Sequence, residues 1–394
     1  FLPRKFKIAV NGAENDRAAI HFHDVGIQLY RNESSRVRLR FLVGGGLGRT
    51  PMVGREIRDD LDPKHLLTYL DAILRVYNLK GRRDNKYKAR IKILVKAMGV
   101  EAFRAAVDAE WESCKDGPTT LTDDVLESMA THFTAPAYEA LDGVAERRFL
   151  DEATSRDPLF AGWVARNSEA HQQTGYRAVT ITLKAAGNAP GDISAEQMDA
   201  IAKLADRYSF GELRTTHQQN IVLADVRESD LLELWRELQP LGLAASNAGH
   251  ITDMICCPGG DFCSLANAKS IPVAQALQER FDAMDYEYDL GPIELNISGC
   301  MNACGHHHVG HIGILGVDKK GQEFYQICLG GSQGGTAQVA QILGPSFSRA
   351  DVTDTIEKIL QCYLSLRDSE DETFLAVFQR CGMQPFKEAV YGRA

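Results

Sequence analysis

Apolar residues recur along the chain with two spacings, and each spacing predicts one kind of element. A recurrence at every second position predicts strands, and a recurrence every three to four positions predicts helices. Strands are expected at residues 7–10, 36–43, 176–183, 212–224, 293–297, 312–317 and 324–329. Helices are expected at residues 64–78, 86–98, 101–112, 194–208, 228–238 and 352–366. Because both elements recur throughout, the pattern predicts an α+β protein.

Changes in this pattern divide the chain into four segments. Residues 1–115 read as a mixed α/β domain, and residues 116–158, rich in Thr, Asp, Glu and Ala, read as a helical bridge. Residues 159–243 give strand, helix, strand and helix, which is typical of a small α+β sandwich. Residues 244–394 form the last domain and carry most of the cysteines. A chain of 394 residues is long enough for several such cores.

Composition narrows the class of protein. The hydrophobic content of 44% and the charged content of 25% are ordinary for a globular protein in water. No apolar run is long enough for a membrane helix, and the first residues lack a secretory signal, so we expect a cytoplasmic protein with no membrane partner. The net charge of −9 argues against nucleic-acid binding. The chain begins with Phe1, which suggests either a missing N-terminal segment or a processed mature form.

Five of the nine cysteines lie in one region, and four of them form two pairs. Cys257 and Cys263 are separated by five residues, and Cys300 and Cys304 by three. Zinc sites favour two-residue spacings, whereas wider spacing suits a cubane in which each iron takes one thiolate. An odd cysteine count without a secretion signal favours a metal site over disulfides. Buried, inert thiols are the alternative, and Cys256 could replace Cys257 as a ligand. Glycines that leave room beside the thiols are Gly259, Gly260, Gly299 and Gly305.

These segments resemble the signature of the sulfite and nitrite reductase haemoproteins. The matching segments are Cys257-Pro-Gly-Gly-Asp-Phe-Cys263 and Ile297-Ser-Gly-Cys300-Met-Asn-Ala-Cys304-Gly. The resemblance covers essentially the whole chain, beginning with Leu2-Pro-Arg-Lys-Phe-Lys7. It implies one [4Fe–4S] cluster on the four cysteines and a sirohaem whose axial ligand is Cys304. It also implies a ferredoxin-like half-domain at residues 159–243, placed between sirohaem-binding domains at 1–115 and 244–394, the second holding the cluster.

The resemblance further implies a reaction and its site residues. It favours an assimilatory sulfite reductase of cysteine biosynthesis, which reduces sulfite to sulfide with six electrons. Lys5 and Lys7 are expected to bind the oxyanion and relay protons. Nitrite reductases of the family commonly carry Asn in the place of Lys7, so this lysine favours sulfite. The alternatives are nitrite reduction to ammonia, a [4Fe–4S] electron-transfer module without sirohaem, and a zinc-stabilised structural protein. The alternative interpretation of Lys5 and Lys7 is that they are two exposed lysines on an edge strand with no role at the site.

Other segments are expected to wall the sirohaem. Its eight carboxylates need a cationic pocket, and residues 81–92 hold six cations, although a charge run is often only a solvated helix face. By resemblance, the cofactor-binding residues are Arg90, Lys92, Gly45, Gly46, Gln219, Asn220 and Asn302. The glycines would allow close approach of the macrocycle, and Asn302 would orient the cysteine loop by hydrogen bonds. The histidines His306, His307, His308 and His311 are interpreted as packing residues instead of a second metal site.

The source of electrons is expected to be a separate protein. The sequence holds no flavin or nicotinamide motif. The resemblance implies either an NADPH-dependent FAD/FMN flavoprotein subunit or ferredoxin as the donor. It also implies a preceding half-domain with two arginines that complete the anion site, and these are not within this sequence.

Overall fold

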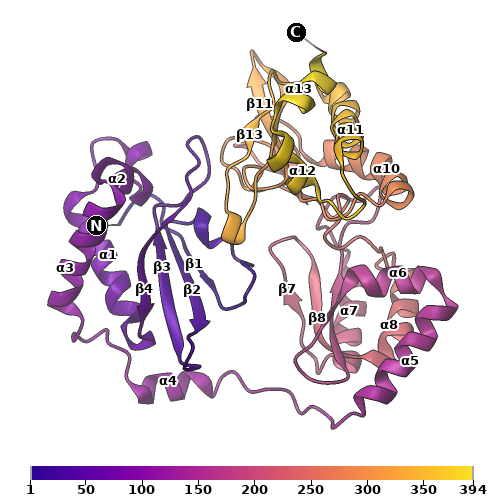
Figure 1. Cartoon of the computed structure of the whole chain (residues 1–394), viewed down its shortest axis with the longest axis horizontal. Coiled ribbons are helices and arrows are strands. Elements are labelled where there is room, and N and C mark those ends of the chain that lie inside the picture. Colours follow the sequence, from indigo (N-terminus) through magenta and orange to yellow (C-terminus); the bar gives the residue numbers. More distant parts are fainter. Residues whose placement is uncertain (1, 393–394) are drawn as a thin grey trace. The chain divides into compact units, whose positions relative to one another are not determined.

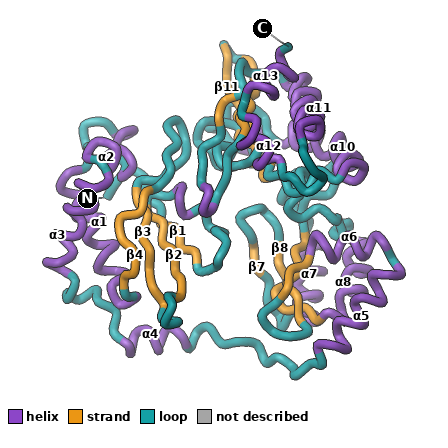
Figure 2. The backbone as a smooth tube through the Cα atoms, viewed as in Figure 1, coloured by secondary structure: helices purple, strands orange, loops and turns teal. Residues whose placement is uncertain are grey.

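The structure is a computed structural model that describes residues 2–392, with all of their side chains apart from those at positions 283 and 285–288. The chain divides into two compact units (Figure 1). Unit 1 comprises Phe1–Ala135 and Ser332–Val339, and unit 2 comprises Pro136–Gly331 and Ala340–Ala394. Both units combine sheets with helices (Figure 2), which confirms the α+β class.

Unit 1 packs three helices on one four-stranded sheet. Its strands are β1 (Ile8–Asn11), β2 (Val25–Arg31), β3 (Val37–Val43) and β4 (Arg55–Leu61). Its helices are α1 (Leu66–Lys80), α2 (Ile91–Met98), α3 (Val100–Cys114) and α4 (Asp123–Ala130). The strand order is β1-β2-β3-β4, with β1 and β2 parallel and the other pairs antiparallel. The core lies between the sheet and α1, α2 and α3, and includes Phe41, Tyr69 and Trp111.

The first part of unit 2 packs helices on an antiparallel sheet. Its strands are β5 (Ser168–Ala170), β6 (Tyr176–Ile181), β7 (Arg214–Thr215) and β8 (Ile221–Arg227), in the order β5-β6-β8-β7. Its helices are α5 (Gly143–Arg156), α6 (Pro158–Asn167), α7 (Ala195–Tyr208) and α8 (Leu231–Leu238). The Ser194 hydroxyl and the Gln197 side chain form a capping box that begins α7, at the residue expected from the sequence.

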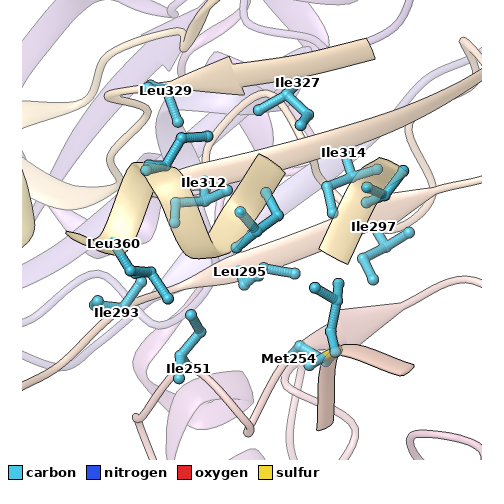
Figure 3. Packing of buried hydrophobic residues seen from close by; sticks show 14 of the residues in the cluster. Ile251, Met254, Ile293, Leu295, Ile297, Ile312, Ile314, Ile327, Leu329 and Leu360 are labelled. Atoms are coloured by element: carbon cyan, nitrogen blue, oxygen red, sulfur yellow. The ribbon is translucent and has the colours of Figure 1, made fainter. Parts of the chain in front are cut away.

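The second part of unit 2 contains a five-stranded sheet in the order β13-β12-β11-β10-β9. Its strands are β9 (Ile255–Cys256), β10 (Leu295–Ser298), β11 (Ile312–Lys319), β12 (Gln322–Leu329) and β13 (Gln341–Ile342). Its helices are α9 (Gly259–Phe262), α10 (Ile271–Tyr288), α11 (Arg349–Leu366), α12 (Phe374–Cys381) and α13 (Gln384–Tyr391). Figure 3 shows Ile297, Ile312 and Leu360 among the side chains that form its core.

The four-stranded sheet of unit 1 and the five-stranded sheet of unit 2 repeat one arrangement. Strands β10 to β13 pair as β1 to β4 do, with one parallel pair followed by two antiparallel pairs. Each third strand is followed directly by glycines, and the first of these glycines donates its N–H to the carbonyl of the residue that precedes the second strand. These hydrogen bonds join Gly44 to Asp24 (3.0 Å) and Gly330 to His311 (2.9 Å). The fold therefore contains an internal duplication.

Three expected elements differ in the structure. The strand expected at 212–224 is two strands, β7 and β8, joined by a turn at 216–220. The helix expected at 86–98 is a 3₁₀ turn at Lys86–Lys88 followed by α2, and the strand expected at 7–10 begins at Ile8. Within residues 2–392, no helix is both long enough and apolar enough to cross a membrane.

Candidate functional site

The two cysteine pairs begin at the carboxyl ends of neighbouring parallel strands. Strands β9 and β10 are parallel, and Cys256 pairs in register with Ile297. Cys257 and Cys300 therefore emerge at the same edge of the sheet, one and two residues beyond their strands. The carboxyl edge of parallel strands is where α/β proteins commonly bind ligands.

Direct hydrogen bonds join the two cysteine segments. The N–H of Gly299 donates to the Sγ atom of Cys257 (3.0 Å), and the N–H of Cys257 donates to the carbonyl of Ile297 (3.1 Å). The carbonyl of Gly299 accepts the N–H groups of Asn267 (2.8 Å) and Ala268 (3.1 Å). Residues far apart in the sequence are thus held side by side, with one thiol already accepting a backbone N–H.

The flanking glycines are required by the protein's own packing. A Cβ atom on Gly299 would lie 2.8 Å from the Cα of Gly259 and 2.7 Å from the carbonyl oxygen of Ala268. Gly259 has a φ of +56°, in the left-handed region. The neighbouring main chain therefore leaves no room for a side chain at Gly259 or Gly299, whether or not a cluster is bound.

Cys256 and Cys257 lie in different environments. Cys256 belongs to the hydrophobic core, where burial raises the pKa of its thiol. Its Sγ donates to the carbonyl of Cys257 (3.2 Å). Cys257 is half-buried and accepts the Gly299 N–H. Since a metal ligand must be a thiolate, the environment favours Cys257 over Cys256.

The remaining expected ligands lie on the turns that follow. Cys263 is the C-cap of α9 and is half-buried, Cys300 is buried, and Cys304 is exposed. The Cys300–Cys304 turn is closed by a hydrogen bond from the Ala303 N–H to the Cys300 carbonyl (3.2 Å). The Gly305 N–H then donates to the Ser298 hydroxyl (3.1 Å).

Asn302 does not have the expected orienting role in this turn. Its side chain is exposed and makes no hydrogen bond to any residue that the structure describes. The backbone bonds of Ala303 and Gly305 hold the turn instead. The expectation that Asn302 orients the cysteine loop by hydrogen bonds is therefore not met.

The four expected cluster ligands are all thiols. Among the described residues, no three His, Cys, Asp or Glu side chains are grouped as they would be around a single metal ion. A cubane differs because its thiolates bind separate irons and need not converge on a single point. The N–H···S bond to Cys257 and the exposure of Cys304 are compatible with such a group.

The side chains of Gln219 and Asn220 form hydrogen bonds with residues near the cysteines. The Gln219 side-chain amide donates to the Cys256 carbonyl and accepts the Cys256 N–H, both at 2.9 Å. The Asn220 amide donates to a carboxylate oxygen of Asp253 (2.9 Å) and accepts from the Lys184 ammonium (3.1 Å). The residues expected to wall the sirohaem therefore hold the segment that carries Cys257. The sequence analysis missed Lys184 and Asp253, because no motif marks either residue.

Lys5 and Lys7 lie just before β1 instead of within it. Both side chains are exposed, while Phe6 between them packs partly against the unit 1 core. Both lysines are therefore exposed immediately before β1, with Lys5 in a bend of the chain. The Lys7 backbone N–H donates to the carboxylate of Asp24 (3.1 Å).

Arg90 and Lys92 are turned into unit 1. The Arg90 guanidinium forms a buried ion pair with Asp24, whose side chain is fully buried. The Lys92 ammonium donates to the carbonyls of Leu47 (3.0 Å) and Thr50 (2.7 Å). Burial lowers the pKa of Lys92 to about 8, and the charge of Arg90 acts in the same direction. The charged groups of Arg90 and Lys92 therefore already interact with groups of the protein.

Gly45 and Gly46 lie close to other parts of unit 1, and only Gly46 lies against Arg90 and Lys92. A Cβ atom on Gly45 would lie 2.6 Å from the carbonyl oxygen of His23. A Cβ atom on Gly46 would lie 3.1 Å from the Lys92 side chain and 3.3 Å from the Arg90 guanidinium. Close backbone approach explains both glycines, as expected, but the approaching partner within the described structure is the protein.

The histidines after Cys304 pack inside unit 2. His307 is buried, and burial lowers its pKa to about 3. Burial also lowers the pKa of His311 to about 4, and its Nδ1 atom accepts the N–H of Glu294 (3.2 Å). Both are neutral imidazoles at pH 7.

Comparisons with known proteins agree with these features. The "Nitrite and sulphite reductase 4Fe-4S domain" family matches residues 1–115 and 248–394. The chain belongs to the nitrite and sulfite reductase family. The "Nitrite/Sulfite reductase ferredoxin-like half domain" matches residues 169–241, which confirms the expected half-domain. Membership implies the two cofactors expected from the sequence, sirohaem and a [4Fe–4S] cluster.

Individual relatives are distant. The chain is 26% identical to sulfite reductase [ferredoxin] 1 of Mycolicibacterium paratuberculosis, over 95% of this chain and 61% of the relative. It is 25% identical to the ferredoxin–nitrite reductase of Synechococcus elongatus, over 91% of this chain and 63% of the relative. The solved structure of the Mycobacterium tuberculosis NirA protein shares the fold, with a TM-score of 0.74, 24% identity, and coverage of 98% of this chain and 64% of that one. The chain thus spans about three fifths of the length of these relatives.

Proposed function

We propose that the chain is part of a sulfite reductase haemoprotein, which adds six electrons to sulfite and releases sulfide. The observation that carries this proposal is the hydrogen bond from Gly299 to the Cys257 Sγ atom at the carboxyl ends of β9 and β10. It holds the two cysteine pairs side by side at one edge of a sheet. The family match over both sirohaem-binding domains supports the same function.

The cluster ligands in this proposal are Cys257, Cys263, Cys300 and Cys304. Cys304 is also the axial ligand of the sirohaem iron, and its exposure leaves the thiol accessible to a second metal centre. When bound, sirohaem and the cluster supply the redox chemistry that cleaves S–O bonds. The protein holds the thiolates, and the Gly299 N–H stabilises the negative charge on Cys257.

Lys5 and Lys7 bind the anion and supply protons in this proposal. Both side chains are exposed, and Phe6 between them is partly buried against the unit 1 core. Two neighbouring cations are well suited to hold an oxyanion. Lys7 favours sulfite, because nitrite reductases of the family commonly carry Asn at this place.

The residues expected to wall the sirohaem take different roles in this proposal. Asp24 and the carbonyls of Leu47 and Thr50 already satisfy Arg90 and Lys92. We therefore propose that Arg90 and Lys92, with Gly45 and Gly46, shape the wall. The exposed Lys86 and Lys88 on the preceding turn are better placed to meet carboxylates. Gln219 binds the main chain of the cysteine segment, and Asn220 binds Asp253, both within unit 2.

The wider assignment follows the sequence analysis. We propose sirohaem-binding domains at 1–115 and 244–394, a helical bridge at 116–158 and the half-domain at 159–243. The donor is ferredoxin or an NADPH-dependent flavoprotein, and the setting is sulfate assimilation in the cytoplasm. Both curated relatives above are named for ferredoxin, which supports the first donor.

The test of this function uses the full-length protein purified without oxygen. We expect four irons and four sulfides per cluster, one further iron in sirohaem, and chlorin-like absorption. The value of kcat/KM for sulfite should exceed that for nitrite, and Lys7→Asn should lower the sulfite value by about tenfold or more. Lys80→Asn, an exposed lysine at the end of α1, is the matched control. A preference of the parent for nitrite would replace sulfite as the substrate, and zinc without iron would overturn the enzyme assignment.

A further inference from the structure

Lys184 is a lysine enclosed within unit 2 beside the cysteine-bearing segment. Its side chain has no exposed surface. Its ammonium group donates to the Gln218 carbonyl (2.5 Å) and to the Asn220 side-chain oxygen (3.1 Å), and it pairs with the Asp253 carboxylate (3.0 Å). These three partners match the three N–H donors of an ammonium group. Lys184 is thus a fully hydrogen-bonded buried charge.

Both carboxylate oxygens of Asp253, the counter-ion of Lys184, accept hydrogen bonds. One of its carboxylate oxygens accepts from Lys184 and from the Asn220 side chain (2.9 Å). The other accepts the N–H of Gly249 (3.0 Å). Burying such a pair costs desolvation energy and gives little net stability compared with an apolar core. Stability alone therefore does not account for the Lys184–Asp253 pair.

The pair is connected to the cysteine segment through residues 218–220. The turn between β7 and β8 contains Gln218, Gln219 and Asn220, and Lys184 holds it from both sides of Gln219. Gln219 has a φ of +64°, a conformation that non-glycine residues adopt only when their surroundings hold them there. Its amide makes two hydrogen bonds to the main chain of Cys256, the residue before Cys257. The buried pair thus fixes the position of the Cys257 main chain.

The pair also places fixed charge near these thiols. The ammonium group of Lys184 and the carboxylate of Asp253 both bind the turn at residues 218–220, and Gln219 of that turn binds the main chain of Cys256. Charges separated by protein interior interact much more strongly than charges in water. A cluster gains one negative charge when it is reduced. The ammonium group favours that gain, and the carboxylate opposes it.

We infer that the Lys184–Asp253 pair positions the Cys257 side of the [4Fe–4S] cluster and tunes its reduction potential, with Gln219 as the mechanical link. Lys184 is a positioning residue, because it acts through Gln219 and through its field and does not ligate iron. This inference rests on the proposed function, since it takes Cys257 as a ligand. It adds a role for the half-domain that the family match does not assign.

The test is a charge cycle on the full-length holoprotein. Lys184→Met, Asp253→Asn and the double variant are compared with the parent by potentiometric titration, followed by the electron paramagnetic resonance signal of the reduced cluster. We expect Lys184→Met to lower the midpoint potential and Asp253→Asn to raise it. The double variant, which is neutral at both positions, should return towards the parent value.

A matched control separates charge from loss of stability. Leu204→Ala weakens the buried core of the same half-domain without touching the pair, and it should leave the midpoint potential unchanged. Shifts in the same direction for both single variants, or an equal shift in Leu204→Ala, would overturn the inference.

A second variant keeps the inference testable if Lys184→Met does not fold. Gln219→Leu removes both hydrogen bonds to Cys256 and should broaden the resonance signal of the reduced cluster; an unchanged line shape would count against the mechanical link. The iron and sulfide content of the parent distinguishes a failure of the proposed function from a failure of this inference. A parent without a cluster would overturn the proposed function, whereas a parent with a cluster that ignores the pair would overturn only this inference.

Discussion

The carboxylate of Asp24 binds the guanidinium of Arg90 through both of its oxygens, with N···O distances of 2.9 to 3.0 Å. The same carboxylate accepts the backbone N–H of Lys7, and the Asp24 carbonyl accepts the N–H of Gly44. One buried residue therefore joins three segments of unit 1: the lysines before β1, the glycines after β3 and the start of α2. The expected anion-binding residues depend on Asp24 for their position.

Asp24→Asn should loosen all three segments. The substitution leaves the Arg90 charge buried without a counter-ion, which typically costs about 3–5 kcal/mol. Urea unfolding should show this loss, and hydrogen exchange should rise at residues 5–11 and 44–46. Asp84→Asn is the control, because Asp84 pairs with Arg82 on the exposed surface and should give no measurable change. Unchanged exchange at both segments in Asp24→Asn would contradict the proposed organising role.

The four cysteines make a separate prediction that concerns composition. Replacing Cys257, Cys263, Cys300 or Cys304 by serine removes one thiolate and should lower the iron and acid-labile sulfide of the cluster below about half of the parent level. Cys256→Ala should retain both, because the thiol of Cys256 is buried in the core with a raised pKa. Iron and sulfide assays on protein purified without oxygen decide the matter. Loss of the cluster in Cys256→Ala but not in Cys257→Ser would exchange their roles.

Local patterns predicted α7, α8, α11 and several strands of unit 2, because the signals of these elements are short-range, but did not predict α10, α12 or α13. The capping box at Ser194 and the apolar strands that became β10, β11 and β12 are visible in a few residues each. The strand β4 was missed, because its sequence Arg-Glu-Ile-Arg-Asp-Asp-Leu is mostly polar and gains its place from pairing with β3. Tertiary pairing decides such a segment, and a local pattern does not report it.

The candidate site was predictable in its cysteines and less so in its cations. Two spaced cysteine pairs constrain chemistry strongly, and the structure brings the Cys257 segment beside the segment that leads to Cys300. The basic run could not reveal that Arg90 and Lys92 turn inwards, because that depends on Asp24, 66 residues away in the sequence. Lys184 was missed for the same reason, since its partner Asp253 is 69 residues distant.

Lys92 predicts a pH dependence of folding in the apo-protein. Its pKa is about 8 in the folded state and 10.5 ordinarily, so the folded state favours the neutral amine. The stability that this shift contributes is fully present above pH 10.5 and is lost as the pH falls through about 8. The free energy of unfolding of the parent should therefore rise between pH 8 and 10.5, relative to Lys92→Met, by at most about 3 kcal/mol.

Urea unfolding of both proteins at several pH values in that window measures the difference and cancels the other titrating groups. Lys88→Met serves as the control, because the Lys88 side chain is exposed. Its difference from the parent should stay flat across the window. A flat difference for Lys92→Met as well would show that the burial of Lys92 does not shift its titration.

The duplicated glycines give the last prediction, which separates two explanations of the same residues. A Cβ atom on Gly45 would lie 2.6 Å from the His23 carbonyl oxygen, and one on Gly331 would lie 2.8 Å from the His308 carbonyl oxygen. If this packing explains the glycines, Gly45→Ala and Gly331→Ala should each destabilise the apo-protein by about 1–3 kcal/mol, each in its own unit. Gly12→Ala and Gly335→Ala, where a Cβ atom meets nothing within 4 Å, should be neutral or slightly stabilising. Calorimetry of the apo-protein and sirohaem content of the holoprotein provide the two readouts. Alanine variants that unfold normally but lose sirohaem would instead assign the glycines to the approach of the macrocycle, because the cost would then arise only when the cofactor is bound.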